Sequence, residues 1–347
     1  MTTTRTADSP TGTTWLDLPD APRIDGLRFR RSRRDDADYD ATAAVIRAAN
    51  EADGIPYAPS GANVREDWEE SASFDPDQDA ILVEVDGRQV ANAGVDRIQR
   101  GSSIVYEVWG HVVPDHRGRG LGRTLLAANV RHAGERAAVD PDPRPAFAGS
   151  FTQDSEAAHR RLLSDAGFGT VRYFFDMRRE LTDVEVAPLP AGLEVRPVTP
   201  DQHRAIWEAD VEAFRDHWDA REPEPSDFDH LFGKADLDTS LWVVAWDGDE
   251  VAGSVQPWVW KAENASLGIE RAWLEHISVR RPWRRRGLAT ALTTEALRRL
   301  RDAGMADAML GVDAENPTGA LRIYEAMGFE VAYRAQAGRL ALRAARS

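Results

Sequence analysis

The amino-acid sequence predicts an α+β fold made of two consecutive copies of one domain, each with a mixed sheet flanked by helices. An arginine-flanked glycine turn occurs at residues 117–122 and again at residues 284–289. Other landmarks recur in the same order 161 to 167 residues later in the chain, which indicates a duplication. Within each copy the strands come first and a long helix follows the fourth strand, an order typical of a mixed sheet.

The composition is that of a globular protein, and it excludes several classes of function. The 347 residues are enough for two domains, and contents of 42% hydrophobic and 29% charged residues exclude a disordered chain. A net charge of −15 disfavours a general nucleic-acid binder, because the phosphate backbone would be repelled. The absence of cysteine excludes disulfides, thiolate metal sites and a cysteine acyl-enzyme.

The sequence also indicates where the protein is located. No apolar run approaches the roughly 20 residues that a membrane-spanning helix needs. Residues 1–22 are rich in Thr, Asp and Pro and lack the apolar centre of a secretory signal. We therefore expect a disordered tail over residues 1–22, a cytoplasmic protein and no membrane partner.

Each copy is expected to open with a strand, a helix and a hairpin. The first strands and helices are expected at residues 26–30, 36–50, 192–196 and 200–214. Asp86-Gly87 and Asp247-Gly248 each stand between two strand-like runs, and Asp-Gly is a strong signal for a tight hairpin turn.

The later part of each copy contains the glycine turn. A strand leads into the turn, and a long helix, a fifth strand and a short helix follow it. The first three of these elements are expected at residues 104–113, 121–138 and 146–151, and again at 273–279, 288–303 and 306–312. The short helices end at Gly167-Phe168 and Gly328-Phe329. A dinucleotide-binding fold would place its glycine turn after the first strand, so a dehydrogenase is disfavoured.

The domain limits follow from the repeat. We expect a first domain over residues 23–182 and a second over residues 192–347. Residues 183–191, which contain Pro188 and Pro190, are the expected linker.

The second copy resembles the GCN5-related N-acetyltransferase (GNAT) superfamily. Ile277-Ser278-Val279 leads into the arginine-glycine turn, and Asn316, Tyr324 and Gly328-Phe329 stand downstream in the order of that family's last helix. The resemblance extends over nearly the whole chain after Ile24. It implies two tandem GNAT-like domains with mostly antiparallel sheets, and acetyl-CoA as the acyl donor with no metal.

The chemistry of the turn fits this resemblance. Glycines let the backbone approach a pyrophosphate, the helix N-terminus offers unpaired N–H donors, and arginines supply positive charge. The resemblance implies that main-chain groups of Ile277 and Val279 pair with the pantetheine arm, and that the Val279 N–H polarises the thioester carbonyl. The expected cofactor-binding residues are Ile277, Val279, Arg284, Arg285, Arg286, Gly287, Leu288, Ala289, Thr290 and Asn316.

Two residues are candidates for catalysis. Tyr324 matches the family's proton donor to the departing thiolate, with a buried packing tyrosine as the alternative. Glu275 is the candidate base, and strand alternation predicts that it shares a face with Ile277 and Val279. The alternative for Glu275 is a solvent-facing or ion-paired carboxylate, and His276 is expected on the opposite face in a structural role.

The first copy is expected to be degenerate. Alignment of the copies places Leu163 at the position of Tyr324, Ser155 at that of Asn316 and Val108 at that of Glu275. The phosphate turn remains, so the first copy is expected not to catalyse transfer although it is a weaker candidate for CoA binding. The residues concerned are Val112, Arg117, Gly118, Arg119, Gly120 and Gly122.

The acceptor site is expected in the region between the first two helices of the second copy, as in the superfamily. Asp216, His217 and Trp218 lie there, and an acidic, aromatic wall would suit a cationic amine. Trp258 and Trp260 are candidates for the floor of this site, although tryptophans on strands are more often part of the core.

The leading hypothesis is an N-acetyltransferase that moves acetyl from acetyl-CoA directly to a primary amine of a small molecule. One alternative is acetylation of a cysteinyl amine, since the chain is distantly similar in architecture to mycothiol synthase. An alternative of another class is a non-catalytic acyl-CoA-binding sensor or scaffold. The acceptor, the length of the acyl group, and whether the protein is a monomer or a homodimer stay open.

Overall fold

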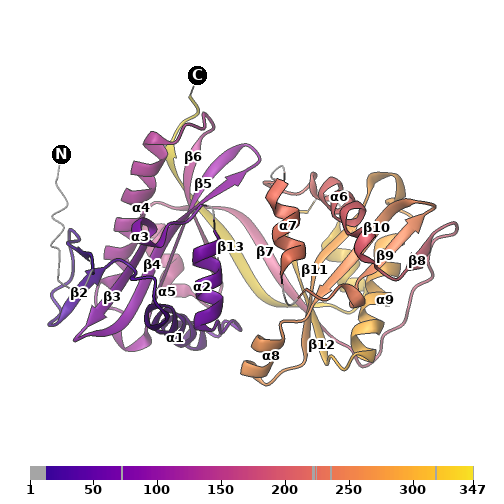
Figure 1. Cartoon of the computed structure of the whole chain (residues 1–347), viewed down its shortest axis with the longest axis horizontal. Coiled ribbons are helices and arrows are strands. Elements are labelled where there is room, and N and C mark those ends of the chain that lie inside the picture. Colours follow the sequence, from indigo (N-terminus) through magenta and orange to yellow (C-terminus); the bar gives the residue numbers. More distant parts are fainter. Residues whose placement is uncertain are drawn as a thin grey trace. The chain divides into compact units, whose positions relative to one another are not determined.

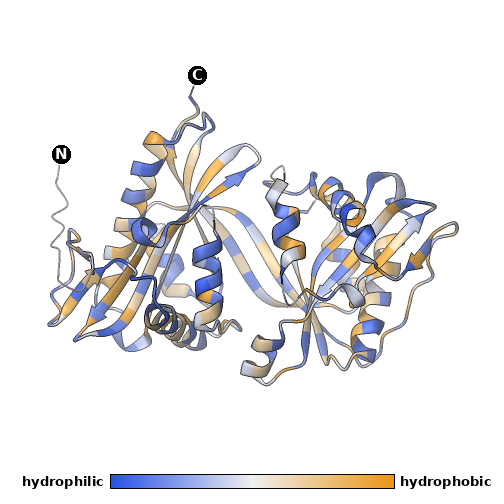
Figure 2. Cartoon of the chain, in the orientation of Figure 1, coloured by the Kyte–Doolittle hydropathy of each residue, from blue (hydrophilic) through white to orange (hydrophobic). Residues whose placement is uncertain are grey.

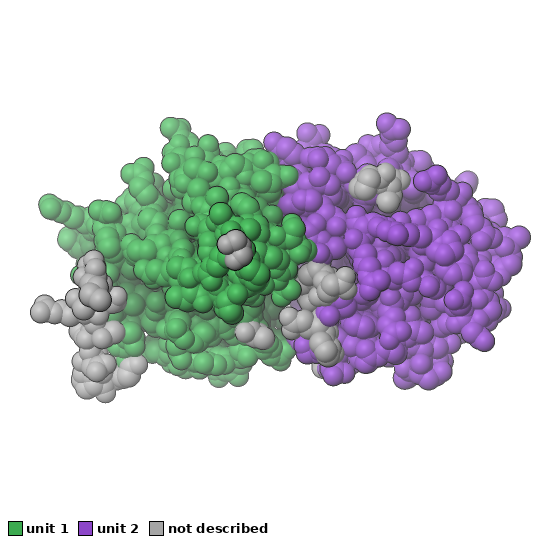
Figure 3. All heavy atoms as spheres, turned by 90° about the horizontal axis from the view of Figure 1, so that it is seen from above, with its two compact units in different colours: residues 1–171, 336–347 green, residues 172–335 purple. Residues whose placement is uncertain are grey.

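The computed structural model describes residues 13–71, 73–220, 223, 225–234, 237–316 and 319–346. The chain forms two compact units (Figure 3). The first comprises the residues up to Val171 together with Gln336–Ser347, and the second comprises Arg172–Ala335. Within the described ranges, no helix is both long and apolar enough to cross a bilayer.

The first unit is a sheet with the order β1-β2-β3-β4-β5-β6, followed by the end of β13 (Figure 1). Neighbouring strands from β1 to β5 are antiparallel, and β5 pairs with β6 in parallel. The strands are β1 (Trp15–Leu16), β2 (Leu27–Arg30), β3 (Ala80–Val85), β4 (Arg88–Arg100), β5 (Ser103–Val112) and β6 (Ala146–Gln153). The helices are α1 (Asp36–Asp53), α2 (Gly61–Glu70), α3 (Pro76–Asp79), α4 (Leu121–Val139) and α5 (Ala157–Asp165).

Side chains of β3 alternate between two apolar clusters, as expected for a sheet covered on both faces. Ile81 and Val83 pack in the cluster that contains Leu121 and Leu125 of α4. Ala80 and Leu82 pack in the cluster that contains residues of α1 and α2. The helices carry both hydrophobic and hydrophilic residues, which is typical of amphipathic helices that cover a sheet (Figure 2).

The second unit repeats this plan with the strand order β7-β12-β11-β10-β9-β8. β11 and β12 are parallel, and the other pairs are antiparallel. The strands are β7 (Gly169–Glu180), β8 (Glu194–Arg196), β9 (Val243–Asp247), β10 (Glu250–Trp258), β11 (Arg271–Val279), β12 (Asp307–Asp313) and β13 (Glu330–Arg343). The helices are α6 (His203–Phe214), α7 (Pro225–Gly233), α8 (Lys261–Leu267), α9 (Leu288–Asp302) and α10 (Ala320–Ala326).

Two apolar clusters lie on opposite faces of this second sheet. Val243 and Ala245 of β9 pack in the cluster with α9 and α10. Trp242, Val244 and Trp246 pack in the cluster with α6, so these two tryptophans belong to the core rather than to an exposed surface.

The unit boundaries fall inside two long strands, β7 after Val171 and β13 after Ala335. β7 follows the first repeat in sequence, yet it pairs with β12 of the second unit. The end of β13 lies next to β6 in the sheet order, and Leu340 and Leu342 pack against the core of the first unit. Each unit is therefore completed by the last strand of the other repeat. These limits differ from the expected domains 23–182 and 192–347. A strand belongs to the unit whose strands it pairs with, even when its sequence belongs to the other repeat.

The predicted fold class is confirmed, and the elements common to both repeats lie close to the expected ranges. The two hairpins differ in detail. Asp86 (φ 50°) and Gly87 (φ 78°) both have positive φ, as a type I′ turn requires. In the second hairpin Asp247 still pairs with Glu250, and Gly248 (φ 60°) begins the loop. The turn there is displaced by one residue from the expected position.

The prediction of a disordered tail over residues 1–22 is wrong for residues 13–22, and residues 1–12 lie outside the described residues. Trp15 and Leu16 form β1 and pair with Arg30 and Phe29. Leu16 and Leu18 pack against the core of the first unit. Thr, Asp and Pro dominate the composition of this segment, so the composition alone does not indicate its few apolar side chains. Burial of those side chains holds the segment against the first unit.

A buried ion pair joins β2 to α1. Arg30 Nη1 lies 2.6 Å from Asp38 Oδ2, with side-chain exposures of 3% and 1%. Burial alone would raise the pKa of Asp38, but hydrogen bonds from Arg30 and Arg33 lower it to about 2. The carboxylate therefore stays charged across the physiological range.

We expect Asp38→Ala to destabilise the first unit by about 1.5–3 kcal/mol, because the buried Arg30 loses its bidentate partner and keeps only the ion pair with Glu84. Denaturant unfolding followed by circular dichroism measures this. Asp165→Ala is the control, since the Arg161–Asp165 pair is 85% and 67% exposed. Its effect should stay within about 0.5 kcal/mol. Equal effects of the two substitutions would contradict a stabilising role for the buried pair.

Candidate functional site

Strands β11 and β12 part within the second sheet. They pair at Arg271↔Asp307, Ala272↔Ala308 and Trp273↔Met309. Beyond this point β11 continues to Val279 and β12 to Asp313 without pairing to each other. The parted strand edges offer backbone N–H and C=O groups that an extended ligand can pair with.

A pocket of ≈ 620 Å³ lies at this opening, within the usual range for small-molecule sites. The end of β11, the end of α6, the first turn of α9, and α10 with the segment before it line the pocket. All expected cofactor residues of the second copy except Arg286 are among its lining residues: Ile277, Val279, Arg284, Arg285, Gly287, Leu288, Ala289, Thr290 and Asn316. Their role in binding stays a prediction.

The turn before α9 is open and positively charged. Gly287 has a φ of 83°, and a Cβ added there would meet no atom within 4 Å. No side chain caps the N-terminus of α9. The first backbone N–H groups of this helix therefore have no side-chain acceptor at the pocket. Arg285 holds a φ of 61°, a rare conformation for a side-chain-bearing residue that clusters at binding sites. Among the described residues, no acid pairs with Arg285.

Arg284 has a different role from Arg285. Its Nε donates to the Val279 carbonyl (2.9 Å), Nη2 to the Ala213 carbonyl (3.2 Å) and Nη1 to Asp216 (2.6 Å). It thus clamps the end of β11 to the end of α6. Arg286 donates to the Ala191 carbonyl (3.3 Å) and does not line the pocket.

The first unit contains the same clamp. Arg117 donates to the Val112 carbonyl (3.0 Å), the Ala49 carbonyl (3.1 Å) and Asp53 (2.6 Å). Both repeats use the first arginine of the turn in this way. We infer that this arginine holds the turn in shape and does not serve mainly to supply charge to a ligand.

The three expected acceptor residues are placed differently from one another. Asp216 lines the pocket but binds Arg281 and Arg284, and their hydrogen bonds hold its pKa well below the usual range. Its charge is therefore already compensated. His217 lines the pocket, with its ring 4.2 Å from that of Phe214. Trp218 does not line it and packs 5.9 Å from Phe174.

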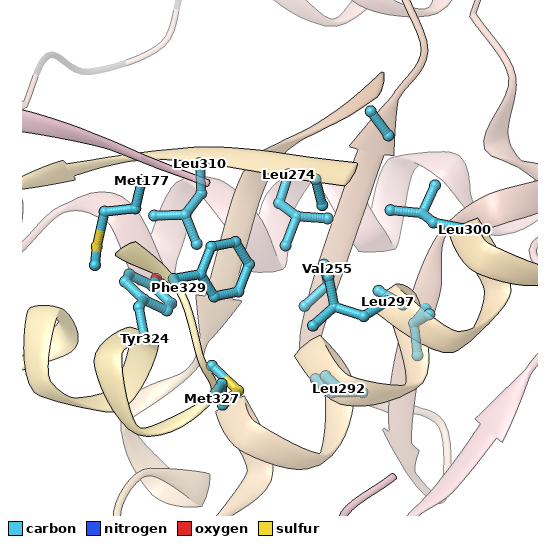
Figure 4. Packing of buried hydrophobic residues seen from close by; sticks show 14 of the residues in the cluster. Met177, Val255, Leu274, Leu292, Leu297, Leu300, Leu310, Tyr324, Met327 and Phe329 are labelled. Atoms are coloured by element: carbon cyan, nitrogen blue, oxygen red, sulfur yellow. The ribbon is translucent and has the colours of Figure 1, made fainter. Parts of the chain in front are cut away.

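Tyr324 lies on α10 with its ring against Phe329 (6.1 Å), and Met177 and Leu310 are nearby (Figure 4). It lines the pocket and is only 8% exposed. Burial raises its pKa to about 12, so the phenol keeps its proton at any physiological pH. No group in the described part of the chain hydrogen-bonds its hydroxyl.

The alternation expected for Glu275 is wrong. The register between β10 and β11 runs from Gln256↔His276 to Pro257↔Leu274, so Glu275 is the extra residue of a β-bulge. Leu274 and Ile277 both pack in the α9 cluster, and Glu275 does not line the pocket. Instead it accepts a hydrogen bond from Trp260 Nε1 (3.3 Å).

His276 faces α6, away from Ile277 and Val279, as expected. Its Nδ1 lies 2.6 Å from Asp210 Oδ2. Burial opposes protonation, but the Asp210 carboxylate raises the pKa of His276 above its ordinary value.

The glycine turn of the first unit is covered. Gly118 (φ 72°) and Gly120 (φ 96°) have the conformation of Arg285 and Gly287. A Cβ added at Gly120 would lie 3.3 Å from Pro22, and Thr124 Oγ1 donates to the Asp20 carbonyl (3.1 Å). Leu163 is buried in place of Tyr324, and β4 and β5 pair without a bulge.

Sequence reasoning missed several lining residues. They are Ala213, Ser278, Trp283, Ala320 and Ile323. Trp283 stands directly before the arginine turn, and this position in the sequence could have marked it as a lining residue. Its Nε1 donates a hydrogen bond to Asp247 Oδ2 (2.9 Å). Ala213 comes from α6, and only the folded chain brings that helix to the turn.

A model of the acetyltransferase (GNAT) family matches residues 43–142 and 203–329. The mycothiol acetyltransferase of Streptomyces scabiei is 33% identical over 221 residues, which are 63% of this chain and 66% of that relative, just under two thirds of its length. The mycothiol acetyltransferase of Geodermatophilus obscurus is 29% identical over 86% of this chain and 92% of that relative.

Two solved structures resemble the chain over most of its length. The crystal structure of a GCN5-related N-acetyltransferase from Sphaerobacter thermophilus has a TM-score of 0.73 and 29% identity, covering 94% of this chain and 98% of that one. A tandem GNAT protein from the clavulanic acid biosynthesis pathway has a TM-score of 0.66 and 16% identity, covering 91% of this chain and 98% of that one. The second likeness concerns the fold alone.

We expect Arg284→Ala to lower the melting temperature, because the Val279 and Ala213 carbonyls lose a charged donor worth about 1–3 kcal/mol. Arg285→Ala is the matched control at the next position, and should change stability by no more than about 0.5 kcal/mol. Differential scanning calorimetry of both variants compares them. A greater loss for Arg285→Ala would contradict the assignment of the clamp.

Proposed function

Because the chain belongs to the acetyltransferase (GNAT) family and is an acyltransferase, we propose that it transfers acetyl from acetyl-CoA to a primary amine of a small molecule. The single observation that carries this proposal is the pocket at the parted strands. It brings an open, arginine-bearing helix N-terminus and the buried Tyr324 hydroxyl to one site. In this proposal the amine attacks the thioester directly, and the chain has no cysteine that could form a cysteine acyl-enzyme.

The turn residues fit a diphosphate. The uncapped N-terminus of α9 and the open Gly287 provide backbone donors, and Arg285 supplies a cation without an acidic partner among the described residues. Anions bind readily at such a terminus. Acetyl-CoA, when bound there, supplies the activated acetyl group as a thioester.

The extended pantetheine arm is expected between β11 and β12. Ile277 and Val279 present their main-chain groups at that edge, and the Val279 N–H is the candidate donor to the thioester oxygen. Arg284 fixes this edge by binding the Val279 carbonyl.

Tyr324 stabilises the departing sulfur. A pKa of about 12 makes the phenol a weaker acid than a thiol, whose pKa is about 8.5, so net proton transfer to the thiolate would be unfavourable. The hydroxyl therefore donates a hydrogen bond to the thiolate, a contribution that needs no change in the charge of Tyr324.

A narrower candidate is acetylation of a cysteinyl amine. The relatives that match this chain over 86% of its length include a mycothiol acetyltransferase, which favours this acceptor over polyamines and amino sugars. Comparison of kcat/KM across these three classes tests it. A preference for a polyamine would reject the cysteinyl acceptor and keep the general proposal.

A scaffold or sensor would bind acetyl-CoA without releasing free thiol. Incubation of the full chain with acetyl-CoA and an amine panel, followed by thiol detection and mass spectrometry of the amine, separates the two classes. Absence of thiol release and of an acetylated product with every amine would reject the enzymatic proposal.

We expect Arg285→Ala to weaken CoA binding about 10–100-fold, because one charge-assisted contact to phosphate is lost. The melting temperature should not change, and the difference should shrink at high salt. Isothermal titration with CoA measures the affinity. Arg161→Ala, an exposed arginine of α5, is the control and should bind CoA as the wild type does. Unchanged affinity in Arg285→Ala would place the diphosphate elsewhere.

We expect Tyr324→Phe to lower kcat about 100-fold with little change in the KM for acetyl-CoA, because the lost hydrogen bond acts on the departing sulfur. Thiol release at saturating amine measures kcat. Tyr173→Phe is the control, since Tyr173 is 50% exposed. A Tyr324→Phe enzyme with normal kcat would remove the tyrosine from the mechanism.

A further inference from the structure

Strand β7 brings Asp176 into the second unit. Asp176 pairs in register with Gly311 of β12, and its neighbours Phe175 and Met177 belong to the core on the α9 face. Since side chains alternate along a strand, Asp176 faces the opposite side of the sheet. In the part of the chain that the structure describes, no group forms a hydrogen bond with its carboxylate.

Glu275 lies on that same opposite face. The bulge in β11 turns Glu275 and His276 away from the α9 core, as their contacts with Trp260 and with Asp210 of α6 demonstrate. Trp273↔Met309 is the last parallel pair, and Glu275 and Gly311 each stand two residues further along their own strand, where the two strands no longer pair with each other.

Gly311 has no side chain, and its strand β12 lies between β7, which carries Asp176, and β11, which carries Glu275. Leu310 and Val312 point into the α9 core, while Gly311 is exposed on the other face. A Cβ added at Gly311 would lie 3.7 Å from Asp176 Oδ1. Glu275, Gly311 and Asp176 thus form a row across three adjacent strands, where β11 and β12 begin to part.

The row lacks a cation. Burial and, secondarily, the Glu275 charge raise the pKa of Asp176 to about 6. Burial also raises the pKa of Glu263 on α8, and Glu275 adds to that rise. The other charged groups near this row are paired with one another: His276 with Asp210, Arg172 with Asp313, and both Arg178 and Arg271 with Asp307.

Aromatic rings adjoin the row on two sides. Trp258 and Trp260 stack with centroids 5.0 Å apart, and Trp260 donates to Glu275. Phe174, which precedes Asp176 on the same face of β7, packs 5.9 Å from Trp218. Carboxylates next to aromatic faces suit an ammonium group.

We propose that Asp176 and Glu275 together bind the ammonium group of the acceptor and remove its proton. This inference rests on the proposed function and adds a residue supplied by the first repeat. The carboxylate pair takes one proton from the ammonium. The nitrogen lone pair then forms the C–N bond to the thioester carbon as the C–S bond breaks. The second nitrogen proton leaves with the thiolate, so ammonium and acetyl thioester yield amide, thiol and one proton.

The pair also defines the class of acceptor. A carboxylate next to the amine would be repelled by Asp176 and Glu275, so amines whose neighbouring carboxyl is esterified or amidated are preferred to free amino acids. The probes are S-methyl-cysteine methyl ester and free S-methyl-cysteine, because neither contributes a thiol to the thiol-release assay. Spermidine and glucosamine complete the panel.

The test compares Asp176→Asn with wild type on the best amine of this panel. We expect kcat/KM for the amine to fall about 10–100-fold, as for loss of one charge-assisted contact, while KM for acetyl-CoA stays unchanged. The acidic limb of kcat/KM should lie near pH 6 in the wild type and move to lower pH in the variant. Its preference for the ester over the free amino acid should shrink.

Two further variants keep the test decisive. Glu180→Gln, on the same strand and 69% exposed, should behave as wild type. Gly311→Val should raise the KM for the amine by filling the space next to the Asp176 carboxylate, even if Asp176→Asn does not fold. An unchanged amine KM and unchanged pH limb in a folded Asp176→Asn enzyme would overturn this inference alone. A wild-type enzyme that acetylates no amine would overturn the proposed function first.

Discussion

Beyond Trp273 and Met309, strands β11 and β12 no longer pair with each other, and the features of the site follow from that break. Unpaired strand edges inside a sheet are costly unless a ligand or water satisfies them. The opening lets one pocket reach from the arginine turn to Tyr324. The bulge at Glu275 lies where the strands diverge, and it separates the residues of the pocket from those of the opposite face.

The arginine turn has two separate roles, one structural and one proposed for ligand binding, which the sequence motif does not distinguish. Its first arginine holds the end of a strand to the end of a helix in both units, through Arg117 and Arg284. Its second position differs, with Gly118 in one repeat and Arg285 in the other at the same positive φ. The shared arginine holds the scaffold together, and the residue that differs, Arg285, is the one that we propose to bind the diphosphate.

The two repeats depend on each other through their last strands. β7 completes the sheet of the second unit, and the end of β13 contributes Leu340 and Leu342 to the core of the first. The first repeat has a covered turn and no equivalent of Tyr324, yet it cannot be removed without removing the strand that bears Asp176. This exchange gives a physical reason for the first repeat to be retained even if, as we expect from its sequence, it does not catalyse transfer.

The sequence by itself determined the repeated order of strands and helices, the two glycine turns and the position of Tyr324. These depend on local signals such as Asp-Gly pairs, positive-φ glycines and apolar periodicity, which act within a few residues. Attachment of residues 13–22, the exchange of β7 and β13, and the bulge at Glu275 were decided only by tertiary structure. Each of them arises from pairing or packing between segments far apart in the chain. Asp216 illustrates the difference most directly. Its acidity in the sequence predicted a contact with a cationic acceptor, but the fold brings Arg281 and Arg284 to it instead.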